Sequence, residues 1–345
     1  MFLSVIAFLF IILICVIVHE FGHYFAALVF GVKVHEFSFG MGPLLFQRQG
    51  RKNKWSVRAL PVGGFVRLAG MGEENEGEDL KPGEGFQDKA PWKKLVILAA
   101  GALNNILLVI VLATLLLMTR GVMDLSVSEV GAVMPGFPAA EAGLRSGDLI
   151  EKIGEVNVSD WQSMTREIRS QSQKTDNLTL YVRRGSSRLT FTLGTKRETP
   201  DGPALVGIQP AIRKLSFFAA VKGSLSYTFH MTLAMLHGLR EVFVHPAQVD
   251  VSGPVGIAAM AGQAAKAGFY SLLSFLAIIS LNLGIINLLP FPALDGGHII
   301  FALCEMITGR SVSQELEGRV HFIGFVILAL LIVFVTWQDI ARLFH

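Results

Sequence analysis

The sequence predicts a polytopic α-helical membrane protein with four transmembrane helices and one inserted soluble α+β domain. Its composition argues against an ordinary soluble enzyme, because 52% of the 345 residues are hydrophobic and only 17% are charged. The mean hydropathy of +0.52 agrees with this. Several stretches are long and apolar enough to cross about 30 Å of hydrocarbon. A more polar region without any such stretch lies between them, which predicts a separate domain.

Four stretches are predicted to span the membrane. They cover residues 1–30, 95–119, 268–300 and 319–341. The third contains Asn282 and Asn287, so we expect it to face a cavity and not lipid. The first lacks a basic n-region and a small-residue cleavage site, and we therefore interpret it as a retained helix and not as a signal peptide.

The distribution of basic residues predicts the orientation in the membrane. Lys and Arg residues follow the first span and precede the second, whereas none precedes the first. Because basic residues gather on the cytoplasmic side, residues 31–94 are predicted to form a cytoplasmic loop and the N-terminus to lie outside. Four spans then return the C-terminus to the outside, and the basic residue Arg342 near that end argues against this orientation. Within the loop, the acidic stretch over residues 71–89 lacks periodicity and predicts a mobile surface segment.

Residues 125–210 are predicted to form an α+β domain on the outer side. Leu178–Val182 and Leu189–Leu193 alternate apolar and polar residues as paired strands do, and Asp160 or Ser159 is a candidate N-cap of a short helix. The segment 139–150, with its A-G-L-x-x-G-D run, resembles the signature of PDZ domains of bacterial proteases. That resemblance implies binding of an extended peptide or a C-terminus at a sheet edge. The alternative is a spacer whose groove binds nothing.

Residues 211–267 connect this domain to the third span. Between Leu215 and Val244, apolar residues are mixed with Lys222, His230 and Arg240. This mixture favours an amphipathic helix at the outer interface over a fifth span.

The strongest chemical signal is the motif His19-Glu20-Phe21-Gly22-His23 at the end of the first span. Histidines four positions apart lie on one face of a helix, so both imidazoles can reach one Zn²⁺. Glu20 is placed to take a proton from a zinc-bound water. Ionisable groups are costly in hydrocarbon, so the motif predicts chemistry on a substrate that is itself in the membrane. The alternative is a pair of interfacial histidines.

A catalytic zinc site needs a third protein ligand, and we predict Asp295. Prolines before it break the third span, and broken helices at membrane depth generally line a cavity. Gly296 and Gly297 allow close approach of the backbone. The predicted topology brings Asp295 to the same membrane half as His23. His298 is a rival ligand that we rank lower, and a helix-capping Asp295 in a cytoplasmic loop is the other alternative.

Together these motifs resemble the site-2 protease family of intramembrane zinc metalloproteases. The resemblance rests on HExxH in the first span and on the N-x-x-P-x-P-x-x-D-G-G pattern from Asn287 to Gly297. The G-P-x-G-I segment at 253–257 and the small-residue and Asn motif at 100–105 add to it. The order of the motifs covers nearly the whole chain. It is most similar to the bacterial RseP group of regulated sigma-factor pathways, in a shorter form with one PDZ domain.

The resemblance implies one Zn²⁺ per chain on His19, His23 and Asp295, with Glu20 as catalytic base and Asn287 as a contact to the substrate backbone. The implied reaction is hydrolysis of a peptide bond within or near the transmembrane segment of a single-span membrane protein. An anti-sigma factor after a first cleavage, or a signal-peptide remnant, would be such a substrate. The implied location is the bacterial inner membrane, with the active site in its cytoplasmic half.

The resemblance also implies a membrane-reentrant β-hairpin at residues 58–68. Such a hairpin would hold the substrate as an added strand, because an unwound transmembrane helix needs new partners for its amides. The implied substrate-binding residues are Gly63, Gly64, Phe65 and Val66.

Two non-enzymatic functions remain as alternatives. The same His19, His23 and Asp295 could form a transient ion site of a membrane metal transporter or sensor. The chain could also be a PDZ-bearing membrane scaffold with a degenerate active site, although the complete motif argues against this. No cluster of basic residues indicates binding of nucleic acid.

Overall fold

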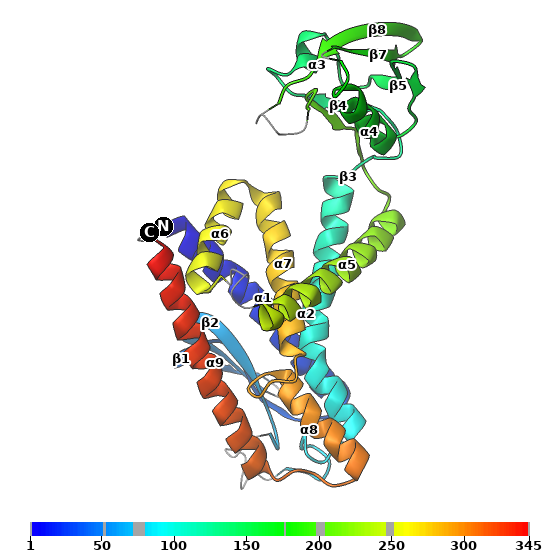
Figure 1. Cartoon of the computed structure of the whole chain (residues 1–345). Helices are drawn as coiled ribbons and strands as arrows, with labels where there is room; N and C mark the ends of the chain where they lie inside the picture. The colour runs from blue at the N-terminus through cyan, green and yellow to red at the C-terminus, as the bar shows by residue number, and fades with distance from the viewer. Residues whose placement is uncertain are drawn as a thin grey trace. The chain divides into compact units, whose positions relative to one another are not determined.

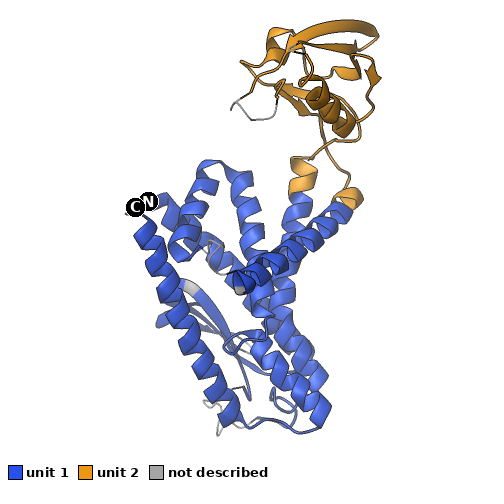
Figure 2. Cartoon of the chain, viewed as in Figure 1, with its two compact units in different colours: residues 1–115, 221–345 blue, residues 116–220 orange. Residues whose placement is uncertain are grey.

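The computed structural model describes residues 2–50, 53–71, 80–175, 177–197, 204–245 and 252–343, apart from the side chains of Val62, Phe243 and Leu343. The chain forms two compact units (Figure 2), of which unit 1 comprises Met1–Leu115 and Val221–His345, and unit 2 comprises Leu116–Ala220. The predicted surface segment 71–89 includes residues 72–79, which lie outside the described residues.

Unit 1 is built mainly from helices (Figure 1), two of which continue into unit 2 (Figure 2). They are α1 (Phe2–Val29), α2 (Pro91–Thr119), α5 (Phe217–Val244), α6 (Pro254–Lys266), α7 (Phe269–Asn287), α8 (Asp295–Thr308) and α9 (Gln314–Leu343). Helices α1, α2, α7 and α9 are long and apolar enough to cross a membrane, which confirms the predicted set of four long apolar helices. Helix α5 is not among these four. Its interfacial position stays a prediction.

The third long apolar helix is shorter than the predicted span 268–300. Helix α7 ends at Asn287, and α8 begins only at Asp295. Pro290 and Pro292 explain the interruption, because proline lacks an amide hydrogen and disfavours helical geometry in the residue before it. The intervening turn contains Ala293, whose φ of +76° is the only positive value at a described non-glycine residue.

Small residues let the helices of unit 1 pack closely. A Cβ at Gly22 of α1 would collide with the backbone of α2, including Gly101 Cα at 2.9 Å. A Cβ at Gly284 of α7 would lie 3.1 Å from the carbonyl oxygen of Ala102. Lipid tails are as apolar as the side chains, so close van der Waals packing of this kind favours helix association in a membrane more than hydrophobic burial does.

A long antiparallel hairpin, β1 (Val34–Gln49) and β2 (Lys54–Leu68), completes unit 1. It is longer than the predicted segment 58–68. Residues 36–39 of β1 have partners in both halves of β2, at 54–57 and at 64–67. Met41 pairs with Leu60 and Phe39 with Gly64, so residues 61–63 form a bulge opposite Gly40. Both Gly40 and Gly63 have positive φ there, at +81° and +84°, which glycine adopts without strain.

Unit 2 is an α+β domain with its own apolar core. Its largest sheet is antiparallel with the order β6-β5-β7-β8. These strands are β5 (Leu149–Ile153), β6 (Val156–Asn157), β7 (Asn177–Arg184) and β8 (Ser187–Gly194). The predicted pair of strands is therefore confirmed as the β7–β8 hairpin. The smaller elements are β3 (Val122–Met123), β4 (Val130–Val133), α3 (Pro138–Glu141), α4 (Trp161–Gln171), β9 (Ile208–Pro210) and β10 (Ile212–Arg213).

Two local features of unit 2 follow directly from its sequence. The Asp160 side chain accepts a hydrogen bond from the Ser163 amide at 2.8 Å, which confirms the predicted N-cap of α4. In the A-G-L-x-x-G-D run, the buried Asp148 carboxylate accepts two hydrogen bonds from the Arg184 guanidinium at 2.7 and 2.8 Å. It accepts a third from the Arg145 amide at 2.8 Å. This run therefore ties the start of β5 to the end of β7.

We expect the Asp148–Arg184 pair to make the stability of unit 2 depend on pH. Burial alone would raise the pKa of the Asp148 carboxyl, but the hydrogen bonds from Arg184 and Arg145 outweigh burial and hold that pKa below its ordinary value. The pair therefore contributes stability above the unfolded pKa of about 3.9, and this contribution is lost as the pH falls through the lower folded pKa.

Replacing Asp148 by Asn at pH 7 should lower the free energy of unfolding of unit 2 by about 2 kcal/mol, because a charged hydrogen-bond acceptor is lost. Hydrogen exchange of β5 and β7 in the full chain measures this. Acidification to below about pH 4 should destabilise the wild type more than the Asn variant. Glu155→Gln, at an exposed carboxylate, is the control. Equal acid sensitivity of wild type and Asp148→Asn would contradict the expectation.

Candidate metal centre

Helix α1 presents His19 and His23 on one face, toward α2. Both side chains are buried, with 6% and 8% of their residue surfaces exposed, and their Nε2 atoms lie 3.2 Å apart. Gly101 of α2 provides the space for them. A Cβ at this position would lie 2.8 Å from His19 Cε1 and would also collide with His23 Nε2. The small-residue motif of α2 therefore allows the two imidazoles to lie in the helix interface.

The start of α8 brings a carboxylate to the same point. Asp295 Oδ2 lies 3.0 Å from His19 Nε2 and 3.3 Å from His23 Nε2. The three predicted ligands therefore converge, although they come from two helices that are far apart in sequence. They form one of two groups of potential metal-binding side chains among the described residues.

The donor set fits a zinc ion. Tetrahedral ligands about 2.0–2.1 Å from Zn²⁺ are separated by about 3.3 Å, close to the three distances found here. His23 Nδ1 lies 2.9 Å from the Ile97 carbonyl oxygen, and a proton donated there leaves the Nε2 lone pair free toward the centre. The buried Asp295 Oδ2 faces the two imidazoles, and apart from them no described residue donates a hydrogen bond to it. A bound cation would stabilise two nitrogen lone pairs and a carboxylate oxygen that face one another in an apolar interface.

Glu20 lies between this centre and the β-hairpin. The Val66 amide hydrogen-bonds to its carboxylate. A Cβ built at Gly64 would lie 3.7 Å from Glu20 Cγ. The structure thus places Gly64 and Val66 beside the predicted catalytic base. Of the other two predicted hairpin residues, Gly63 lies against Met41 of β1, and the Phe65 ring lies 5.0 Å from the Arg58 guanidinium carbon.

Asn287, the last residue of α7, also reaches the centre. Its Nδ2 lies 3.4 Å from His19 Nε2, so its amide lies beside the predicted ligands. Sequence reasoning missed the Ile97 carbonyl that orients His23. A main-chain carbonyl carries no sequence signal, and only the close approach of α1 and α2 reveals it.

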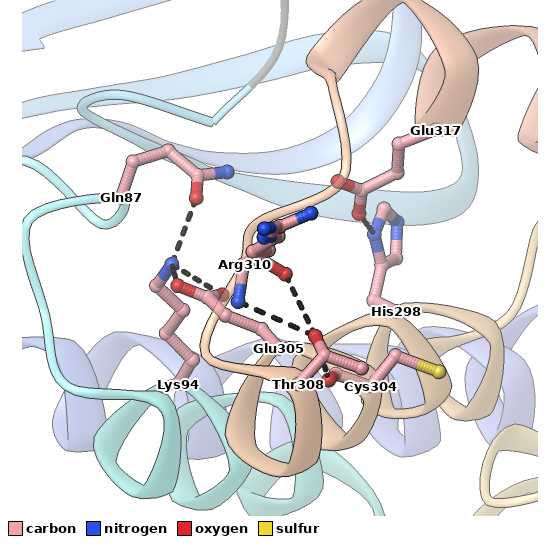
Figure 3. A network of polar contacts seen from close by, with 8 residues as sticks. All are labelled: Gln87, Lys94, His298, Cys304, Glu305, Thr308, Arg310 and Glu317. Carbon is pink, nitrogen blue, oxygen red and sulfur yellow. Dashed lines mark hydrogen bonds and ion pairs between the residues drawn. The ribbon is translucent and has the colours of Figure 1, made fainter.

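His298, the rival ligand, lies outside the centre. Its Nδ1 lies 2.7 Å from Glu317 Oε1, as Figure 3 shows. Its ring stacks on that of His321, with centroids 3.7 Å apart and planes inclined by 13°. The lone pairs of ring nitrogens lie in the ring planes. In two nearly parallel rings these lone pairs lie in separate parallel planes, so they cannot be directed at one ion. The group of His298, Glu317 and His321 therefore fits a metal poorly, and the geometry favours Asp295 as the third ligand.

Comparisons with known proteins place the chain among metallopeptidases. The family model of peptidase family M50 matches residues 7–331. A protein of Clostridium acetobutylicum is 34% identical over 329 residues, which cover 95% of this chain and 94% of that protein. The zinc metalloprotease RasP of Geobacillus kaustophilus is 29% identical over 420 aligned residues, which cover 99% of this chain and 98% of that protein. The crystal structure of a PDZ domain of an SdrC-like protein from Listeria monocytogenes is 23% identical, with a TM-score of 0.22, and covers 24% of this chain and 85% of that one.

We expect Gly101→Ala to disturb the centre. The new methyl group would force the two imidazoles away from α2, and overpacking of this kind costs about 1–3 kcal/mol. Thermal unfolding in detergent and zinc uptake should both decrease. Gly238→Ala in α5 is the control, because a Cβ there meets no atom within 4 Å among the described residues. Identical behaviour of the two variants would show that the Gly101 contact is unimportant.

Proposed function

Because the chain belongs to peptidase family M50 and is a multi-pass membrane zinc metalloprotease, we propose that it cleaves a single-span membrane protein within or near its transmembrane segment. This proposal rests on one observation: Asp295 meets His19 and His23 on α1, a helix that is apolar enough to cross a membrane. Soluble substrates would have little access to a site in such a helix, whereas a membrane-spanning substrate already lies at that depth. A trimmed anti-sigma factor or a signal-peptide remnant has this form.

In the proposed reaction, His19, His23 and Asp295 hold the metal and Glu20 transfers the proton. A bound Zn²⁺ would polarise the scissile carbonyl and make a water more acidic. Glu20 takes the proton of the attacking water and passes it to the leaving amine. The Val66 amide keeps the Glu20 carboxylate oriented toward the centre. The Asn287 amide, beside His19, donates a hydrogen bond to the substrate backbone or to the developing oxyanion.

We propose that the substrate strand adds to β2 near Gly64–Val66. A transmembrane helix must unwind before its peptide bond can be attacked, and a strand edge replaces the hydrogen bonds it loses. The position of Gly64 and Val66 beside Glu20 supports this. Residues 41–46 and 57–60 of the hairpin expose a group of large apolar side chains, which supports insertion of this part of the hairpin into lipid. These are Met41, Leu44, Leu45, Phe46, Val57 and Leu60.

We propose that unit 2 is a PDZ domain on the outer side that selects substrates by size. A groove of about 200 Å³ lies between α4 and β9. Its lining is almost entirely apolar and includes Met134, Phe137, Trp161, Met164, Ile168 and Ile208. Such a groove suits an apolar side chain of an extended peptide or C-terminus, as the resemblance of residues 139–150 to PDZ signatures implies. A substrate with a bulky outer domain would then be rejected until that domain is trimmed.

Glu20→Gln separates the protease from a metal transporter or sensor. The variant should retain one zinc per chain, because Glu20 is not a ligand, and should lose at least about a hundredfold in cleavage rate, because proton transfer fails. A purified membrane-spanning model substrate and zinc analysis measure both. His19→Ala, which removes a ligand, should lose zinc and cleavage together. Cleavage by Glu20→Gln at the wild-type rate would exclude the proposed mechanism.

Replacing residues 125–210 by a short Gly-Ser linker tests the size filter. The wild type should cleave a trimmed substrate and not the untrimmed one, whereas the shortened chain should cleave both. Product formation from the two substrates in proteoliposomes is the measurement. If the shortened chain still does not cleave the untrimmed substrate, the size-filter proposal is contradicted, whereas the proposed catalytic mechanism is unaffected.

A further inference from the structure

We infer that His321 on α9 is a positioning residue for the metal centre. By accepting a hydrogen bond from the Ala293 amide, it holds the turn that aims Asp295 at His19 and His23. This inference rests on the proposed function, because it takes Asp295 to be a zinc ligand.

The turn before α8 determines where Asp295 points. Ala293 adopts a left-handed conformation with φ of +76°, which costs an L-residue roughly 1–2 kcal/mol. Leu294 is extended, and Asp295 is the first residue of α8. A relaxation of Ala293 to negative φ would therefore redirect the start of α8 and move the carboxylate. Such a conformation persists only where neighbouring contacts hold it.

His321 supplies that contact. Its Nδ1 accepts a hydrogen bond from the Ala293 amide at 2.9 Å. An imidazole nitrogen that accepts a hydrogen bond carries a lone pair, so the ring is a neutral acceptor in this arrangement. His321 Nε2 is buried and has no hydrogen-bond partner among the described residues. The bond to Ala293 is thus the polar contact that gives this ring its orientation.

Two further residues hold the His321 ring in place. The His298 ring stacks on it, and Glu317 in turn orients His298 through the 2.7 Å contact drawn in Figure 3. Glu317 and His321 are four positions apart on α9 and so lie on the same face. His298 follows Asp295 by one helical turn. A continuous set of contacts therefore joins α9 to both sides of the turn.

Close packing leaves this arrangement little freedom. A Cβ at Gly297 would lie 3.1 Å from His321 Cε1. A Cβ at Gly324 of α9 would lie 2.6 Å from the Pro292 carbonyl oxygen. The two glycines thus let α9 lie directly against the turn, and α9 acts as a support for the metal ligand in addition to being a long apolar helix.

The ion pair near the C-terminal end of α8 does not determine the direction of Asp295. Lys94 Nζ, only 2% exposed as a residue, lies 2.8 Å from Glu305 Oε2 and 2.9 Å from Gln87 Oε1 (Figure 3). Glu305 is ten residues from Asp295, about 15 Å along the helix. This pair anchors α8 to α2, whereas the direction of Asp295 is determined at the N-terminal turn.

The test compares His321→Leu with His321→Asn in the full chain. Leu and Asn have similar shapes, and Asn Oδ1 can accept the Ala293 hydrogen bond from nearly the position of Nδ1. Zinc affinity is measured in detergent by competition with a chelator. His321→Leu should bind zinc about 10–100-fold more weakly than the wild type, whereas His321→Asn should regain most of the affinity. His237→Leu on α5, an exposed histidine, is the control.

Thermal unfolding of the metal-free forms separates positioning from folding. Both variants lose the stacked ring and only the Leu variant also loses the Ala293 hydrogen bond, so their metal-free melting temperatures should differ by only a few degrees while their zinc affinities differ at least about tenfold. Equal zinc affinity of the Leu and Asn variants, whether strong or weak, would overturn the inference. If the wild type binds two zinc ions per chain and both variants bind only one, the inference is overturned in favour of a metal site at His298, Glu317 and His321. Absence of zinc from the wild type would overturn the proposed function together with this inference.

Discussion

The proposed function of unit 1 depends on one constraint, which is the placement of three candidate metal-ligating atoms in an apolar helical interface. His19, His23 and Asp295 approach one another to within 3.3 Å, where burial would be unfavourable without a cation. Their surroundings serve this arrangement. Gly101 makes room for the imidazoles, the Ile97 carbonyl orients one of them, and the turn before α8 directs the carboxylate.

The helices around the centre pack closely against one another, while the proposed substrate edge belongs to a sheet. Close contacts at Gly22 and Gly284 hold α1, α2 and α7 together, and the Lys94–Glu305 pair joins α2 to α8. The hairpin places a strand edge beside Glu20. A helix has no free backbone groups to offer an unwound substrate, whereas a strand edge does, so the two kinds of structure perform different parts of the proposed reaction.

Much of this was predictable from the sequence where the signal is local. The four apolar helices, the HEFGH motif and the Asp160 cap follow from composition and spacing. Asp295 could be proposed because prolines and glycines surround it. The first strand of the hairpin was missed, although Phe37, Phe39 and Met41 alternate with smaller or polar residues. The supporting role of His321 could not be found in this way, because its contact with Ala293 joins residues 28 positions apart on different elements.

X-ray absorption at the zinc edge of the purified protein tests the central claim most directly. The account predicts one zinc per chain, bound by two imidazole nitrogens and carboxylate oxygen at about 2.0–2.1 Å, with no sulfur ligand. Asp295→Ala, which removes one of the three ligands, should lose the bound zinc, as His19→Ala should. A spectrum that contains cysteine sulfur, lacks imidazole or does not change in Asp295→Ala would contradict the metal centre on which the proposed function rests.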